Sequence, residues 1–187
     1  MKLPFASFLI LNISLLFLLA NTTNAKLIST NIKSTDKVFS NICPKTKQPN
    51  ICLIVLKDDS RTRGAANNHE LGYGTLDIAI SQAKSCVDIF FYCALKMNDG
   101  DRKEKYLDCR DKYNFAVGQL CEAKTILRKN DFATARRRIV DASQVPISCQ
   151  KEIGEPPVEV RSANIVLDFI FDIAYVIVRE LAINRNS

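Results

Sequence analysis

The chain has 187 residues, a formal net charge of +6, seven cysteines and a single histidine. This modest positive charge indicates a bias towards anionic surroundings, such as a polyanionic polymer or an acidic protein surface. No motif resembles those of nucleic-acid-binding proteins, so we exclude nucleic acid as a partner.

Residues 1–25 have the features of a secretory leader. Lys2 provides the positive start, residues 3–20 carry no charge, and small residues end the segment at 23–25. No stop-transfer pattern follows, so we expect cleavage rather than a membrane anchor. The mature chain, residues 26–187, then has 25 basic and 20 acidic residues and a net charge of +5. Its length suits one domain with a hydrophobic core.

Residues 26–60 predict a short helical hairpin. Two apolar clusters of one or two helical turns, at 38–42 and 51–56, are separated by the turn sequence KTKQP. Cys43 and Cys52 flank this turn, and a bridge between them closes a small loop and contributes roughly 2–3 kcal/mol. Helices this short are unstable alone, which is why a covalent link is expected here.

The segment 71–97 predicts the first long helix, after a polar linker or helix start at 61–70. Its apolar residues follow a heptad spacing: Leu76, Ala83, Phe90 and Met97 in one row, and Ala79, Cys86 and Cys93 in the next. Gly72 and Gly74 are expected to weaken only the first turn of this helix.

After a turn at 98–101, the stretch from Tyr106 to Leu127 predicts the helix around which the domain is organised. Its apolar seam consists of Tyr106, Tyr113, Leu120 and Leu127, with Cys109, Ala116 and Ala123 beside them. Such a seam needs partner helices to cover it. A second helical pattern runs from Phe132 to about Cys149, and the short connection predicts that the two helices are antiparallel.

Gly154 and the prolines at 156–157 indicate a loop, and 163–181 predicts the last helix. Asp168 and Asp172 lie one turn apart in its middle, where they would be costly in lipid, so we do not interpret it as a membrane span. We interpret both acids as part of a solvated face. The chain thus predicts an all-α fold: an up-down four-helix bundle at 69–185, preceded by a disulfide-stapled hairpin.

The chain lacks the groups that catalysis needs. His69 is the only histidine and is interpreted as a solvated residue at a helix start. There is no G-x-S-x-G elbow, glycine-rich phosphate loop or H-E-x-x-H motif, and the cysteines are too widely spread for a zinc site. We therefore expect a binding protein, with no enzyme activity, cofactor or metal.

The cysteine pairing stays open on geometry alone. An odd count leaves at least one thiol free or joined to another chain. Cys109 has two acceptable partners: Cys149 at the far end of the next helix, and Cys93, which lies beside it across the preceding turn. A bridge to Cys149 closes a loop of about 40 residues, worth roughly 4 kcal/mol. Cys86 and Cys93 are interpreted as small hydrophobic residues of the seam, and Cys121 as a free thiol.

Several motifs resemble those of plant pectin methylesterase inhibitors. The stretch S-N-I-C-P-K-T at 40–46, followed by Pro49 and Cys52, resembles that family's opening hairpin. The pattern Y-x-x-C-x-x-x-Y-x-x-A-x-x-x-L at 106–120 is similar to the helix with the family's third cysteine. Further matches are Asp131-Phe132, Cys149 seventeen residues on, and the apolar helix from Asn164.

The resemblance implies a secreted four-helix bundle whose cysteines pair first with second and third with fourth, that is, Cys43–Cys52 and Cys109–Cys149. Some members inhibit pectin methylesterase by laying the bundle across its substrate cleft, and others inhibit acid invertases of the wall or vacuole. The C-P-K-T opening and the loop at 154–157 look closer to the pectin branch. The Pro-Lys-Phe tripeptide of some invertase inhibitors is absent before Phe132.

Two features depart from the family pattern. Three consecutive arginines at 136–138 make the third bundle helix unusually basic, and we interpret them as a solvated face. Pro146 falls where the family continues a helix, and is expected to kink or end it.

We therefore expect a monomeric protein of the apoplast or cell wall that inhibits pectin methylesterase in a non-covalent one-to-one complex. Acid invertase is the alternative target, and a non-inhibitory extracellular ligand is the alternative class. The mature form is expected to have no membrane partner and no cofactor. The expected contact residues are outward polar positions of the two central helices: Asp108, Asp111, Asn114, Glu122, Arg136 and Arg137.

Overall fold

The computed structural model describes residues 35–185, so the predicted leader lies outside the described range. Within that range the chain is helical and contains no strand. The elements are α2 (Thr35–Ile42), the 3-10 turn η1 (Cys43–Lys45), α3 (Pro49–Asp58), α4 (Asn68–Leu95), α5 (Gly100–Leu127), α6 (Phe132–Ile153) and α7 (Val158–Arg185). The all-α prediction is confirmed.

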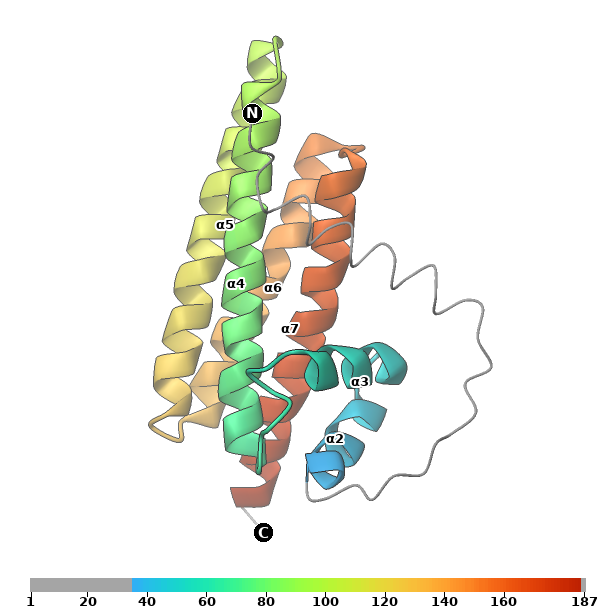
Figure 1. The fold of residues 1–187 in the computed structure, drawn as a ribbon. Coiled ribbons are helices and arrows are strands. Elements are labelled where there is room, and N and C mark those ends of the chain that lie inside the picture. The colour runs from blue at the N-terminus through green and yellow to red at the C-terminus, as the bar shows by residue number, and fades with distance from the viewer. Residues whose placement is uncertain (1–34, 186–187) are drawn as a thin grey trace, which may run out of the picture. The chain divides into compact units, whose positions relative to one another are not determined.

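Helices α4 to α7 form the predicted up-down bundle (Figure 1). α4 packs against α5 and α7, and α6 packs against the same two helices, so each helix has two neighbours. The connections within the bundle, 96–99, 128–131 and 154–157, are each four residues long. Connections this short make successive helices antiparallel.

The predicted seam of α5 lies at the centre of the core, and its four residues Tyr106, Tyr113, Leu120 and Leu127 are fully buried. The ring of Phe90 on α4 packs on the rings of Tyr106 and Tyr113, with centroids 5.8 and 5.0 Å apart. Such aromatic pairs add to the free energy of apolar burial. Among the described helices, α4 alone is long and apolar enough to cross a membrane, but its apolar row fills this core.

Helices α4 and α5 begin earlier than predicted because polar residues cap them. α4 starts at Asn68, where the Asn67 side chain accepts a hydrogen bond from the backbone of the third residue beyond it. α5 starts at Gly100, inside the predicted turn, where the Asp99 carboxylate accepts hydrogen bonds from the backbone amides of Asp101 and Arg102. Capping satisfies amides that have no partner within the helix. The spacing of apolar residues predicts only the buried part of a helix, so it does not predict polar N-terminal turns such as these.

α6 continues through Pro146 to Ile153, four residues past Cys149. Of the two expected effects of Pro146, a kink or an end of the helix, the second is therefore wrong. The proline is buried on the core side, and packing against two neighbouring helices offsets the loss of one backbone hydrogen bond. α7 is likewise longer than the predicted 163–181, and its first turn adds the buried Val160 to the core.

α2, η1 and α3 form the predicted hairpin. The Cys43–Cys52 disulfide closes it, with 5.4 Å between the two Cα atoms, which confirms that predicted bridge. Phe39, Ile42 and Leu56 are buried with the disulfide and belong to the same hydrophobic core as the bundle helices.

Ionic contacts dock the hairpin on α7. The Lys45 ammonium lies 2.5 Å from the buried Glu180 carboxylate. The Lys47 backbone N–H donates to Asp172 at 2.7 Å, and the Lys47 ammonium lies 3.7 Å from Asp168. Asp168 and Asp172 stay partly exposed, in line with the predicted solvated face, but both acids also contact the hairpin.

The link between hairpin and bundle passes very close to α4. A Cβ atom on Gly74 would lie 2.1 Å from the Arg61 carbonyl oxygen and 2.9 Å from the Thr62 methyl group. Thr62 is buried, and its hydroxyl donates to the Leu56 carbonyl at 2.9 Å, which fixes this path. The packing therefore requires a glycine at position 74, which the sequence reading treated only as a weakness of the helix.

Replacing Gly74 with alanine is expected to destabilise the protein by about 1–3 kcal/mol, because the link backbone must move. Helix propensity alone predicts that Gly74→Ala stabilises the protein, because alanine favours a helix more than glycine does. Chemical denaturation followed by circular dichroism measures the change. Gly118→Ala is the matched control, since its added Cβ meets nothing within 4 Å, and it should stabilise by up to about 1 kcal/mol. Equal effects at the two positions would contradict the close approach.

Glu180 makes hairpin docking sensitive to acid. Burial raises the pKa of its carboxyl, but hydrogen bonds and charges from Lys45 and Arg179 lower it by more, so the pKa lies below the ordinary 4.5. A lowered folded-state pKa means that the carboxylate stabilises the fold above the unfolded-state pKa. This stabilisation is lost as the pH falls through the folded-state value.

We therefore expect the unfolding free energy of the wild type to fall more steeply between about pH 5 and pH 3 than that of Glu180→Gln. Urea denaturation across this range measures both slopes. Near neutral pH the variant should be the less stable protein, because Lys45 loses its charged partner. Parallel pH profiles for the two proteins would show that the docking pair contributes nothing.

Candidate functional site

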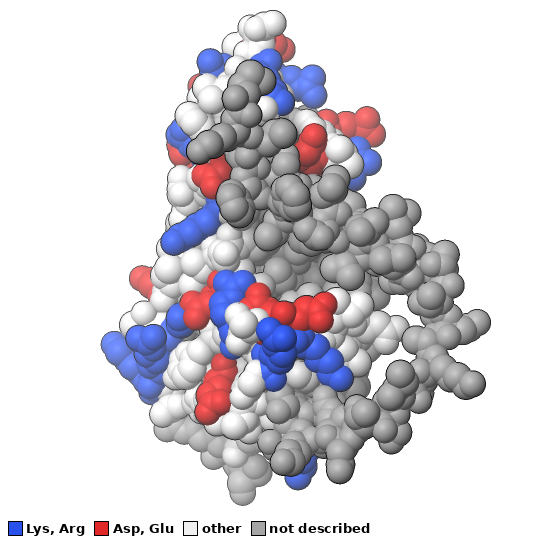
Figure 2. Space-filling model, viewed as in Figure 1, with Lys and Arg blue, Asp and Glu red and all other residues white. Residues whose placement is uncertain are grey.

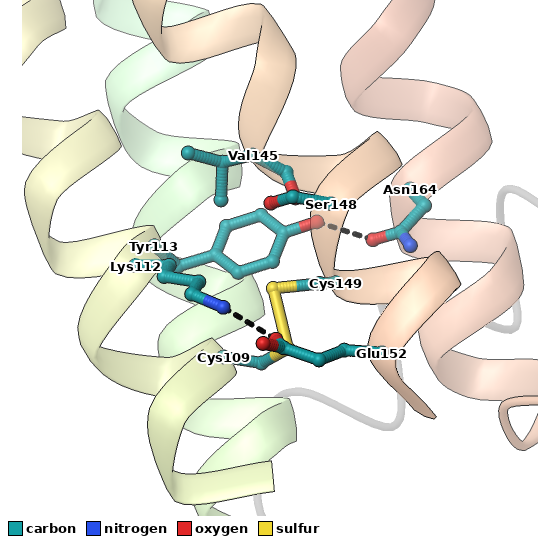
Figure 3. Close-up of a disulfide and its surroundings, with 8 residues drawn as sticks. All are labelled: Cys109, Lys112, Tyr113, Val145, Ser148, Cys149, Glu152 and Asn164. Atoms are coloured by element: carbon teal, nitrogen blue, oxygen red, sulfur yellow. Dashed lines mark hydrogen bonds and ion pairs between the residues drawn. A yellow bond between two sulfur atoms is a disulfide. The ribbon is translucent and has the colours of Figure 1, made fainter. Parts of the chain in front are cut away.

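The pair of helices α5 and α6 is joined covalently. A disulfide links Cys109 to Cys149, with their Cα atoms 5.5 Å apart and both residues fully buried (Figure 3). Cys93, the competing partner, is an unbridged and half-buried thiol on α4, and Cys86 and Cys121 are also unbridged. The expected pairing and the structure agree, and α5 and α6 are held together near one end of the bundle.

Polar contacts surround this disulfide and extend it to a third helix. The Lys112 ammonium on α5 pairs with the Glu152 carboxylate on α6 (Figure 3). The Tyr113 hydroxyl donates to the Asn164 side-chain oxygen on α7 at 2.5 Å. Burial raises the pKa of Tyr113, so its hydroxyl remains a donor. Covalent, ionic and hydrogen-bonding links thus tie α5, α6 and α7 together.

Heptad position does not reveal the Lys112–Glu152 pair. Lys112 lies three residues after Cys109, and Glu152 lies three residues after Cys149. Because α5 and α6 are antiparallel, the two backbone positions lie on opposite sides of the disulfide along the bundle axis. Long side chains, however, lean towards the N-terminus of their own helix. Both therefore return to the level of the disulfide and meet there, as Figure 3 shows.

The atoms of Cys109, Cys149 and Glu152 that could coordinate a metal ion, two sulfurs and a carboxylate oxygen, lie within 4.8 Å of one another. Metal ions bind thiolates, and here the two sulfurs are bonded to each other. The cluster is therefore a structural cross-link in this oxidised form.

The expected contact residues on α5 share one side of the helix. Asp108, Asp111, Asn114 and Glu122 are all exposed, and their spacing keeps them within one broad stripe opposite the buried seam. The structure thus brings these four residues to one face. Their part in binding remains a prediction.

The three arginines of α6 point in three directions, because successive residues of a helix are 100° apart. Arg136 turns towards α7, with its guanidinium carbon 5.8 Å from the Tyr175 ring centroid. Arg137 is exposed. Arg138, absent from the expected set, turns towards α5, with its Nε 2.9 Å from the Glu122 carboxylate. The interpretation of all three as one solvated face is wrong, and Arg136 does not lie with the α5 residues.

The sequence reading also missed an exposed aromatic residue on α5. Phe115 is 56% exposed and lies between Asp111 and Glu122 along the same stripe. One turn further on, Gly118 borders a shallow hollow together with Cys121 and residues of the following turns. A count of polar outward positions cannot find such residues, although their spacing of three and four is visible in the sequence.

The only histidine and the most deeply buried free thiol both have structural surroundings. His69 is half-buried, with its ring 5.5 Å from that of Phe132 and 6.3 Å from that of Tyr73, so its interpretation as a solvated residue is wrong. Burial raises the pKa of the Cys86 thiol to about 12. A thiol needs to ionise to attack a substrate, so Cys86 is inert at ordinary pH.

Charges of both signs are interspersed on the face shown in Figure 2. Oppositely charged side chains of the described residues also form ion pairs, such as Lys124 with Asp77 at 2.5 Å and Arg61 with Asp59 at 2.7 Å. On this face, then, the positive net charge is not concentrated in one patch of a single sign.

Residues 37–171 match the family described as plant invertase/pectin methylesterase inhibitor. A curated relative, the pectinesterase inhibitor of Actinidia deliciosa, is 28% identical over 150 residues. The match covers 79% of this chain and 80% of that relative.

Solved structures of Arabidopsis proteins share the fold. Mutant form A of a pectin methylesterase inhibitor is similar with a TM-score of 0.67 at 25% identity, covering 75% of this chain and 95% of that one. A pectin methylesterase inhibitor from Arabidopsis thaliana is similar with a TM-score of 0.59 at 24% identity, covering 80% and 98%. The sequence match and the shared fold agree. The chain belongs to the plant invertase/pectin methylesterase inhibitor family, a family of inhibitor proteins and not of enzymes.

Proposed function

We propose that this protein inhibits pectin methylesterase, by placing the exposed face of α5 and α6 across the substrate cleft of the enzyme. The curated relative and the two similar structures named above are all inhibitors of this enzyme by name. The complex is non-covalent and one-to-one, because the mechanism needs only a surface that excludes pectin from the cleft.

The observation that carries this proposal is the covalent link between α5 and α6. The buried Cys109–Cys149 bridge and the adjoining Lys112–Glu152 pair hold the two helices in one arrangement. A surface that is already ordered loses less conformational entropy when it binds. The hairpin packs chiefly on α7, which leaves the α5–α6 face available to a partner.

The proposed place of action is the apoplast or cell wall, with the protein acting as a monomer. The leader-like residues 1–25 support export, and the two disulfides suit an oxidising compartment. Pectin and its methylesterases lie in that compartment.

Acid invertase is the second candidate target, because the matched family description names invertase inhibitors as well. The two candidates call for the same kind of surface and differ in the enzyme that it fits. Assays of both enzymes with one protein preparation separate them.

Oxidised recombinant protein comprising residues 26–187 is expected to slow methanol release from pectin by a plant wall methylesterase. Inhibition should reach completion at one inhibitor per enzyme, and gel filtration should recover a one-to-one complex. Measured methanol release against inhibitor concentration gives the inhibition constant.

An acid invertase assayed in parallel is the control. Inhibition of the invertase alone would replace the proposed target with the second candidate. If neither enzyme is inhibited at micromolar excess and a wall extract yields only a receptor on pull-down, the chain is an extracellular ligand instead.

Replacing both Cys109 and Cys149 with alanine tests the role of the bridge. The loop-entropy estimate gives a loss of about 4 kcal/mol of stability, and the freed helix pair should inhibit at least about tenfold more weakly while circular dichroism still reports helix. Cys93→Ala is the matched control, because this thiol is unbridged and lies on α4, outside the proposed α5–α6 face. A bridge-free protein that folds and inhibits like the wild type would contradict the preorganisation argument.

A further inference from the structure

The exposed side of α5 carries a second row of residues with heptad spacing. Steps of three and four residues keep a row on one side of a helix, and fourteen residues of helix span about 21 Å. All members of the row are exposed, and they lie opposite the buried seam: Asp108, Asp111, Phe115, Gly118 and Glu122.

Phe115 is the one aromatic residue in this row, at its centre, with 56% of its surface exposed. Two other exposed aromatic residues, Phe91 and Tyr92 on α4, each have a cation over the ring, from Arg110 and Lys96. Within residues 35–185, no such cation and no ring contact accompanies Phe115. Tyr92 is exposed to a similar extent, 59%, so what distinguishes Phe115 is that no cation of the described residues lies over its ring.

A hollow lies about one helical turn from Phe115, towards the C-terminal end of α5. A Cβ on Gly118 would meet nothing within 4 Å, and the hollow is bordered by Cys121, Glu122 and Arg138. Glycine within a helix is less favourable than alanine, so helix stability does not account for it. The row therefore presents an apolar projection next to a depression, with carboxylates at both ends.

We propose that Phe115 is the apolar anchor of the inhibitory face, and that Gly118 leaves room for a side chain of the enzyme. This inference rests on the proposed function and names the residues that determine its strength. Aromatic anchors near the centre of an interface, surrounded by polar residues, contribute most of the binding energy.

The substrate's chemistry favours the cleft of pectin methylesterase as the occupant. Pectin is a chain of acidic sugars in which some carboxylates are methyl esters, so a cleft that binds it accepts negative charge along its length and apolar groups between. The α5 row has a similar sequence of features: carboxylates at Asp108 and Asp111, an apolar ring at Phe115, and a carboxylate at Glu122. Asp111 and Glu122 also pair with arginines of this protein, so these two carboxylates are partly neutralised in the free inhibitor. A rod about 21 Å long also fits an elongated groove.

The test compares inhibition constants of wild type, Phe115→Ala and Phe91→Ala against one pectin methylesterase. Phe115→Ala should weaken inhibition about tenfold or more, with an unchanged melting temperature because the residue is exposed. Phe91 is also exposed, at 44%, but lies on α4, and Phe91→Ala should inhibit within about twofold of wild type.

Gly118→Leu is a second variant, for which we expect a higher melting temperature but weaker inhibition. Leucine favours helix over glycine, so the melting temperature should rise by about 2–4 °C. Filling the hollow should nonetheless weaken inhibition about tenfold or more. A loss of inhibition in a more stable protein cannot be attributed to misfolding.

Two failures are distinguishable. If the wild type inhibits but Phe115→Ala and Gly118→Leu inhibit equally well, the anchor is wrong and the proposed function stands. If the wild type itself does not inhibit pectin methylesterase, the proposed function and this inference both fall.

Discussion

The structure depends most on the buried link between Cys109 and Cys149. It lies where the aromatic core residue Tyr113 reaches from α5 to α7, beside the Lys112–Glu152 pair. Apolar burial alone is non-directional and brings helices together without fixing how each is placed. The covalent link and its polar neighbours supply that placement, so the outer faces of α5 and α6 keep a constant relation to each other.

The hairpin is held by a different balance of forces. Its helices are too short to be stable alone, so a disulfide closes it and carboxylates of α7 hold lysines of its turn. Because these contacts lie on α7, the hairpin completes the core without covering α5 and α6. Because the hairpin packs on α7, the outer face of α5 and α6 stays unoccupied. A protein that occludes another protein's cleft requires such a free face.

The buried seam of α5 was predictable because residues three or four positions apart lie on the same side of a helix. The apolar residues from Tyr106 to Leu127 keep that spacing without a break. Contacts between distant segments were not predictable from spacing. From the sequence, Gly74 is only a residue that weakens a helix, whereas the structure shows that the Arg61 carbonyl leaves no room for a side chain there. Likewise, spacing predicts that Asp172 faces solvent and does not reveal its hydrogen bond with Lys47. The same holds for Arg136 and Arg138, whose partners lie on other helices. Phe115 was missed because the search considered only polar residues, which shows that an exposed apolar side chain is as informative as a charge.

The central claim is that the outer face of α5 and α6 covers the enzyme's cleft, and hydrogen exchange in the complex tests it most directly. The exchange rates of backbone amides are compared between the free protein and its complex with pectin methylesterase. The account predicts slowed exchange along α5 and α6, strongest around Phe115, with α4 and α7 unchanged. Slowed exchange confined to α4, α7 or the hairpin would contradict it.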